Sequence, residues 1–119
     1  MKALIISLAT ILFFAFTSED MLTGRWETKP SDKGNVTGVI FKTDKSFEAY
    51  VNKKPFATGI YTFQDNIFSF TDNGCDGMQG VYKINFFSNG DSLRFELVSD
   101  SCNQRREGVL RLTLGKVKQ

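Results

Sequence analysis

Gly24-Arg25-Trp26 opens the first strand-like run of this chain, Leu22–Thr28, and contains its only Trp. The runs of apolar and β-branched residues that follow are short, and none shows a sustained helical period. A Gly-x-Trp triplet is common by itself, so its position at the head of this series is what gives it weight. The stretch therefore points to an all-β domain that begins at this triplet.

The residues before the triplet read as a secretory leader. Lys2 forms the charged region and Ala3–Phe16 the apolar region, and Ala15-Phe16-Thr17 is a suitable cleavage site. The apolar run is shorter than the roughly 20 residues of a membrane span. We expect residues 1–17 to be a signal peptide and 18–119 to be one secreted or periplasmic domain. The alternative is an uncleaved N-terminal anchor.

Eight strand-like runs can be counted from the triplet onward. Asn89-Gly90 between two of them is a strong hairpin signal, because both residues tolerate positive φ angles. Evenly spaced runs of this kind are typical of a barrel or a sandwich. The expected strands are Leu22–Thr28, Val36–Thr43, Phe47–Lys53, Phe56–Gln64, Ile67–Asp72, Gln79–Phe87, Ser92–Ser99 and Gly108–Gly115.

Alternation of apolar and polar residues is clearest in the second half of the chain. Each of these runs has one apolar face, as a closed or sandwiched sheet requires. The earlier run Val36–Thr43 has apolar residues on both faces, so its inward set stays open. The residues expected to point inward together are Phe68 and Phe70, then Tyr82, Ile84 and Phe86, then Leu93, Phe95 and Leu97, and finally Leu110, Leu112 and Leu114.

Cys75 and Cys102 are the two cysteines of the chain. In an exported protein an even pair favours a disulfide, worth on the order of 3 kcal/mol in the chain-entropy model. The alternative is two free thiols. In a simple meander, the loops after the fifth and seventh strands lie at the same end of the sheet. The pair therefore favours an up-and-down barrel over a Greek-key sandwich, with Gly24-Arg25-Trp26 at the opposite end.

Composition excludes several function classes. The chain has no His, which removes His-based catalysis, His-ligated haem and the usual zinc sites. The net charge is +2 and falls to +1 when Lys2 leaves with the leader, so no strong field attracts nucleic acid. No nucleophile motif is present. We therefore expect a protein that is not an enzyme and that uses no cofactor.

Taken together, these features resemble the lipocalin-like, calycin-type barrels. The resemblance rests on the Gly24-Arg25-Trp26 triplet, on the eight-strand meander, and on Arg111, which by analogy packs across Trp26. The segment Asp100–Arg105, together with Cys75, is also similar to small exported bacterial lipocalin-like domains. Unlike lipocalins proper, the chain ends almost at once after the eighth run, and no helix is expected there. The resemblance implies an eight-stranded antiparallel up-and-down barrel in which Gly24, Trp26 and Arg111 are structural.

A barrel of this kind suggests a small apolar or amphipathic ligand in its interior. Tyr61 and Tyr82 would offer hydroxyl groups to a headgroup. The alternative is that all these side chains are simply core and that the protein acts as an interaction or inhibitor module through its bridged rim. The expected lining residues are Tyr61, Phe63, Phe68, Phe70, Tyr82, Ile84, Phe95 and Leu112.

Charged residues gather near the two cysteines. Arg105 either receives an anionic group at the barrel mouth or forms an ion pair with Asp100 that braces the bridge. Asp72, Asp76 and Asp100 would alternatively supply oxygens to Ca²⁺, although their spacing matches no known calcium loop. The sequence thus directs the search for a site to the bridged end.

Overall fold

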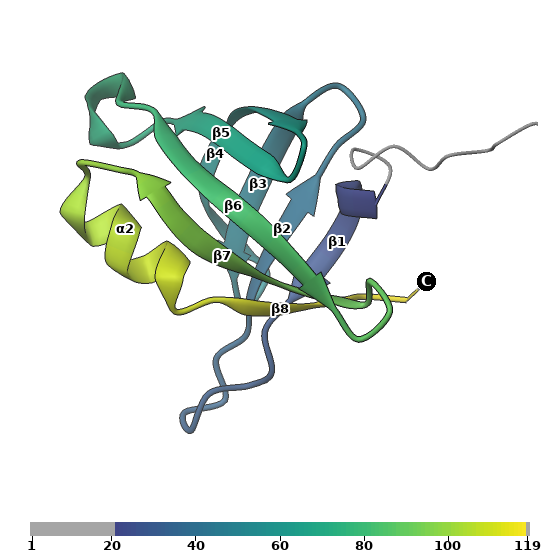
Figure 1. Ribbon diagram of the computed structural model, residues 1–119. Coiled ribbons are helices and arrows are strands. Elements are labelled where there is room, and N and C mark those ends of the chain that lie inside the picture. Colours follow the sequence, from purple (N-terminus) through teal and green to yellow (C-terminus); the bar gives the residue numbers. More distant parts are fainter. Residues whose placement is uncertain (1–20, 119) are drawn as a thin grey trace, which may run out of the picture.

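The computed structural model describes residues 21–118, in which the chain forms a closed antiparallel barrel of eight strands in the order β1 to β8 (Figure 1). The expected all-β, up-and-down barrel is confirmed. The signal peptide expected at 1–17 lies outside the described residues. The strands are β1 (Gly24–Glu27), β2 (Thr37–Phe41), β3 (Ser46–Val51), β4 (Lys54–Gln64), β5 (Ile67–Asp72), β6 (Gly80–Phe87), β7 (Ser92–Ser99) and β8 (Thr113–Lys116).

Besides a helical turn at Met21 and Leu22, the described part of the fold contains the 3₁₀ helix η1 (Cys75–Gly77) and the α-helix α2 (Asn103–Leu110). In Figure 1, η1 and the start of α2 lie together at the left, while the C-terminus and the β6–β7 turn lie at the right. Within residues 21–118, no helix is long and apolar enough to cross a membrane.

The last expected strand differs from the structure. Residues expected to begin the eighth strand at Gly108 instead finish α2, and β8 starts only at Thr113. Leu110, expected on the inner face, is 44% exposed on the helix, whereas Leu114 is fully buried. The Leu-x-Leu-x-Leu spacing mimics a strand, but Gln, Arg and Glu, which precede it, are good helix formers.

Trp26 seals one end of the barrel. Its side chain is fully buried, and its Nε1 donates a hydrogen bond of 2.8 Å to the carbonyl oxygen of Leu22. Its ring centroid lies 6.1 Å from that of Phe86. Gly24 has a φ of +131°, a conformation that only glycine adopts readily. The triplet therefore closes the barrel end opposite η1 and α2.

The expectation that Arg111 covers Trp26 is wrong, because Lys116 takes that place. The Lys116 Nζ lies 4.9 Å from the Trp26 ring centroid and donates a hydrogen bond of 2.6 Å to the Thr23 carbonyl oxygen. The physical reason is register. Since α2 consumes the residues up to Leu110, the strand begins late and Lys116 pairs with Trp26.

Aromatic rings fill the middle of the barrel. Phe68 is the central ring, with centroids between 5.1 and 6.5 Å from those of its neighbours, which are Phe41, Phe47, Tyr61, Phe70 and Phe95. Spacings of this size are favourable for aromatic pairs. The interior next to Trp26 is packed by Phe86, whose ring centroid lies 6.1 Å from that of Trp26 and 6.2 Å from that of Phe63.

Candidate functional site

A cavity of about 420 Å³ lies in the other half of the barrel, between the aromatic core and the bridged end. Its lining is mostly apolar, and it is made by β2, β3, β4, β5, β7 and α2. The residues that line it are Thr37, Val39, Phe41, Phe47, Ala49, Val51, Phe56, Ala57, Phe68, Phe70, Asp72, Phe95, Gln104, Arg105, Gly108, Val109, Arg111 and Leu112.

The helix α2 forms one wall of this cavity. β8 pairs with β7 only along Ser92, Leu93 and Arg94, so the rest of β7 has no strand partner on that side. α2 packs beside β7 there, and Val109 and Leu112 lie against the buried core. The cavity thus exists because a helix, not a continued strand, covers the last part of the barrel.

A β-bulge places Phe56 at the cavity. In the pairing of β3 with β4, Ala49 lies opposite Ala57 and Tyr50 lies opposite Pro55, which leaves Phe56 unpaired. Bulges re-aim side chains in this way. The Phe56 side chain lines the cavity while remaining 59% exposed. It therefore stands at the boundary between the cavity and solvent.

The bridged end is held by the disulfide between Cys75 and Cys102, whose Cα atoms are 5.9 Å apart. Cys102 is the N-cap residue of α2, and Cys75 begins η1. The bond therefore fixes the first turn of the cavity-covering helix to the loop after β5. The sequence placed both cysteines at one end of the barrel, and the structure confirms this.

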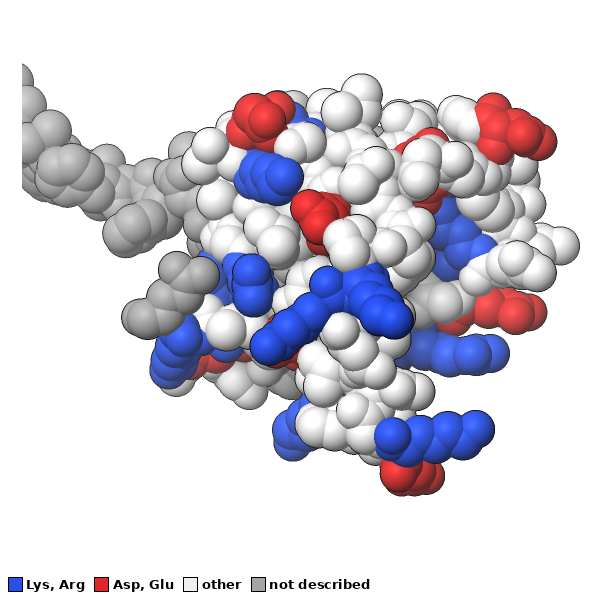
Figure 2. All heavy atoms as spheres, turned by 180° about the vertical axis from the view of Figure 1, so that it is seen from behind, with Lys and Arg blue, Asp and Glu red and all other residues white. Residues whose placement is uncertain are grey.

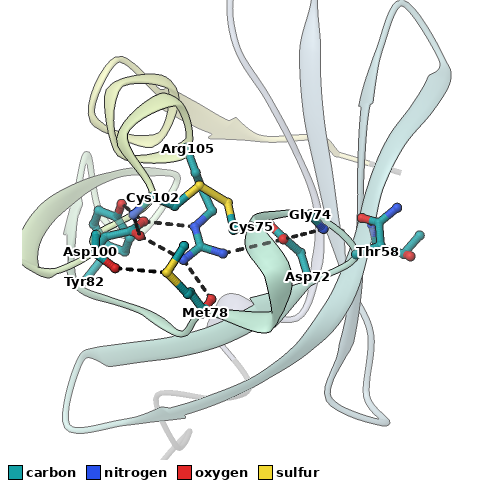
Figure 3. A network of polar contacts seen from close by, with 11 residues as sticks. Thr58, Asp72, Gly74, Cys75, Met78, Tyr82, Asp100, Cys102 and Arg105 are labelled. Atoms are coloured by element: carbon teal, nitrogen blue, oxygen red, sulfur yellow. Dashed lines mark hydrogen bonds and ion pairs between the residues drawn. A yellow bond between two sulfur atoms is a disulfide. The ribbon is translucent and has the colours of Figure 1, made fainter.

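A buried ion pair lies beneath the disulfide (Figure 3). Arg105 donates from Nε to one oxygen of Asp100 at 3.0 Å and from a terminal nitrogen to the other at 2.8 Å. It also donates to the Met78 carbonyl oxygen at 2.9 Å and lies 3.5 Å from Asp72. The Asp100 side chain is completely buried, and that of Arg105 is 7% exposed. This fork is the strong bidentate geometry of arginine and carboxylate.

Asp100 is fully supplied with donors. Besides Arg105, it accepts hydrogen bonds from the Tyr82 hydroxyl and from the Cys102 backbone N–H. Burial opposes its ionisation, but the hydrogen bonds outweigh burial and hold the pKa of Asp100 below its usual value. Burial, with the hydrogen bond to Asp100, raises the pKa of Tyr82 far above its usual range. In the folded protein, Asp100 is therefore ionised at neutral pH and forms a charged pair with Arg105.

The predicted ligand residues divide into two groups. Four of the eight side chains expected to bind a ligand line the cavity, as does Leu112, and the other four lie in the packed core. Tyr61 donates its hydroxyl to the Lys42 carbonyl oxygen at 3.1 Å, and Tyr82 bonds Asp100, so both hydroxyls have partners within the protein. The cavity group is Phe68, Phe70, Phe95 and Arg105, and the core group is Tyr61, Phe63, Tyr82 and Ile84.

Apart from Arg105, the cavity residues contributed by β2, β3 and α2 were not predicted from the sequence. The alternating residues of β3, namely Phe47, Ala49 and Val51, carried a readable signal. Val109 and Arg111 carried none, because they lie in a segment expected to be a strand. Calcium was also considered for Asp72, Asp76 and Asp100, but no group of three or more metal-ligating side chains occurs in residues 21–118.

The chain was compared with known protein families, curated proteins and solved structures. None of them matches it. The topology of the eight-stranded antiparallel barrel is consistent with a calycin-like fold.

Proposed function

We propose that this protein is an exported, lipocalin-like binding protein that holds a small apolar or amphipathic molecule at the bridged end of its barrel. The observation that carries the proposal is the apolar cavity of about 420 Å³, which lies within the range of roughly 300–1,000 Å³ typical of small-molecule sites. A barrel interior with a purely structural role would be filled by side chains, because empty apolar volume destabilises a fold.

Charge distribution supports a small ligand over a polyanion. On the face shown in Figure 2, basic and acidic side chains are interspersed, and the β1–β2 loop, which projects at the bottom, carries both signs. A nucleic-acid surface would instead gather positive charge. The absence of His from the chain favours binding over catalysis. The disulfide agrees with the proposed export to an oxidising compartment.

The neutral fluorescent probe N-phenylnaphthylamine tests the proposal, because its emission rises in apolar surroundings. We expect saturable binding by the purified protein. Ala49→Phe adds a ring to a residue that lines the cavity and should abolish the signal. Thr62→Phe adds the same ring to an exposed position of β4 and should leave it unchanged. Absence of binding by the unaltered protein, or full binding by Ala49→Phe, would contradict the proposal.

A second candidate function is binding of another protein through the bridged rim. It is favoured by apolar side chains exposed there, among them Val98 (56%) and Met78 (41%). Val98 is the unpaired residue of a second bulge, between β6 and β7. Exposed apolar groups of this kind mark contact surfaces when they gather.

Capture of a partner from an extract of the source cells tests this candidate. Val98→Glu should abolish capture, whereas Ile60→Glu, at a 65% exposed position on the outer face of β4, should not. Arg105 is unsuitable for this test, because its ion pair with Asp100 supports the rim itself. Equal capture by both variants would rule out the rim as the contact surface.

A further inference from the structure

Only three charged side chains line the cavity within the described range 21–118: Asp72, Arg105 and Arg111. Asp72 and Arg105 have opposite charges and lie side by side. Arg105 is held by the bidentate contact with Asp100 and lies 3.5 Å from Asp72. Its guanidinium also lies 4.8 Å from the Phe70 ring centroid. The donors of Arg105 are therefore used by the protein, and its positive charge is matched by carboxylates.

Arg111 is in a different situation. It is the C-cap residue of α2, it lines the cavity, and it is exposed to solvent. Across residues 21–118, its guanidinium takes part in no ion pair and no hydrogen bond, since only its backbone N–H is bonded, to Gly108 and Val109. A guanidinium at the edge of an apolar cavity has its five donors available to a ligand. Gln104, which lies near the start of α2, adds a side-chain amide to the same lining.

We propose that the ligand is an anionic amphipath, and that Arg111 binds its carboxylate or similar anionic headgroup while its apolar part lies among Phe47, Ala49 and Phe68. This inference rests on the proposed ligand-binding function and specifies the ligand's class. Guanidinium matches the planar, two-oxygen geometry of a carboxylate. An apolar interior with one polar group at its edge holds such a molecule in a single orientation.

The competing possibility is a cationic headgroup bound by Asp72. That carboxylate is 11% exposed, accepts a hydrogen bond of 2.9 Å from the Gly74 backbone N–H, and lies beside Arg105. A cation placed there would meet the Arg105 guanidinium at close range, and like charges repel strongly where water is excluded. The exposed, unpaired Arg111 therefore favours the anion.

Displacement of N-phenylnaphthylamine by three molecules with the same alkyl chain measures the headgroup preference. The competitors are dodecanoate, dodecanol and dodecylamine, used below the concentrations at which they aggregate. We expect dodecanoate to displace the probe at about tenfold lower concentration than the other two, the ratio that one charge-assisted hydrogen bond supplies. The preference should weaken as salt is raised, because the headgroup contact is near solvent.

Arg111→Met should remove the preference, measured within that variant as the ratio of the dodecanol and dodecanoate concentrations that displace the probe. Arg94→Met is the matched control: it removes the same charge from the exposed face of β7, where Arg94 lies 4.9 Å from the Phe87 ring centroid, and should keep the preference. Probe binding without any headgroup preference, a preference for the amine, or an unchanged preference in Arg111→Met would each overturn this inference alone. Failure of the probe to bind would overturn the proposed function with it.

Discussion

Among the described glycines, Gly59 leaves the least room for a side chain. A Cβ atom added there would lie 2.0 Å from the Thr71 carbonyl oxygen and 2.7 Å from the Phe47 ring. The backbone of β5 cannot move away without breaking its pairing with β4. We predict that Gly59→Ala lowers the free energy of unfolding by about 1–3 kcal/mol, measured by urea titration.

Gly108→Ala is the control for this prediction. It makes the same change within α2, where nothing lies within 4 Å of the added atom. Alanine is favoured over glycine in a helix by up to about 1 kcal/mol, so the variant should be as stable as the parent or more so. Equal losses at both positions would show that the contacts around Gly59 are not the cause.

The hydroxyl group of Tyr82 contributes to stability through its hydrogen bond to Asp100. It donates to Asp100, whose side chain is completely buried, and the tyrosine itself is fully buried. Tyr82→Phe keeps the ring but leaves the carboxylate short of one donor. We predict a loss of about 1–3 kcal/mol in the free energy of unfolding, again by urea titration. A variant as stable as the parent would show that Arg105 and Cys102 satisfy Asp100 without Tyr82.

At the scale of elements, most strands follow from the sequence. β5 and β7 have the expected bounds, because alternation and turn residues agree there. A repeated Gly-x-Tyr also appears in β4 and β6, and the structure gives it a physical meaning. Gly59 and Gly80 both sit where a Cβ atom would meet a neighbour at 3.0 Å or less. These contacts come from the tertiary structure, so the repeat alone does not reveal which neighbour each glycine faces.

The helix α2 could not be predicted for a related reason. None of its residues is buried, so the apolar stripe by which amphipathic helices are recognised is absent. Its position depends on contacts outside the helix: the disulfide of Cys102, the ion pair of Arg105 with Asp100, and the incomplete edge of β7. The cavity was likewise predicted only in part. The expected residues of β5 and β7 line the cavity, and so does Arg105 of α2, but the rest of the helical wall and Arg111 were not expected there.

The disulfide links the start of α2 to η1, so its removal should act mainly on this helix. We predict that Cys75→Ser with Cys102→Ser lowers the free energy of unfolding by about 2–4 kcal/mol while the strand signal in circular dichroism is retained. Probe binding should weaken as well, because α2 forms one wall of the cavity. Weaker stability with unchanged binding would show that α2 keeps its place without the bond.

The whole molecule has two unlike halves. One is a solid aromatic core closed by Trp26, and the other holds the cavity and a buried charge network. Because this network is buried, its titration changes the stability of the whole barrel. Since the pKa of Asp100 is lowered in the folded state, its contribution is present above the unfolded value of about 3.9 and is lost as pH falls through the folded value.

We therefore predict that the free energy of unfolding falls steeply below about pH 4, and that Asp100→Asn flattens this slope. The variant should also be less stable at neutral pH, because Arg105 loses its buried partner. Asp65→Asn, on an exposed turn, is the control and should keep the parental slope. Thermal melts between pH 2 and 7 measure all three proteins, and equal slopes would contradict the assignment to Asp100.

The position of Trp26 gives the experimenter a natural optical reporter. It is the only indole in the sequence, it is shielded from water, and it lies at the end of the barrel away from the cavity. Its emission should thus follow melting of the closed half and stay constant while a ligand that does not absorb at the indole emission wavelengths, such as dodecanoate, binds. In a separate sample, a bound dye excited outside the indole absorption band reports on the opposite half. Heated under the same conditions, the two signals would reveal whether the halves of the barrel come apart in a single cooperative step or one after the other.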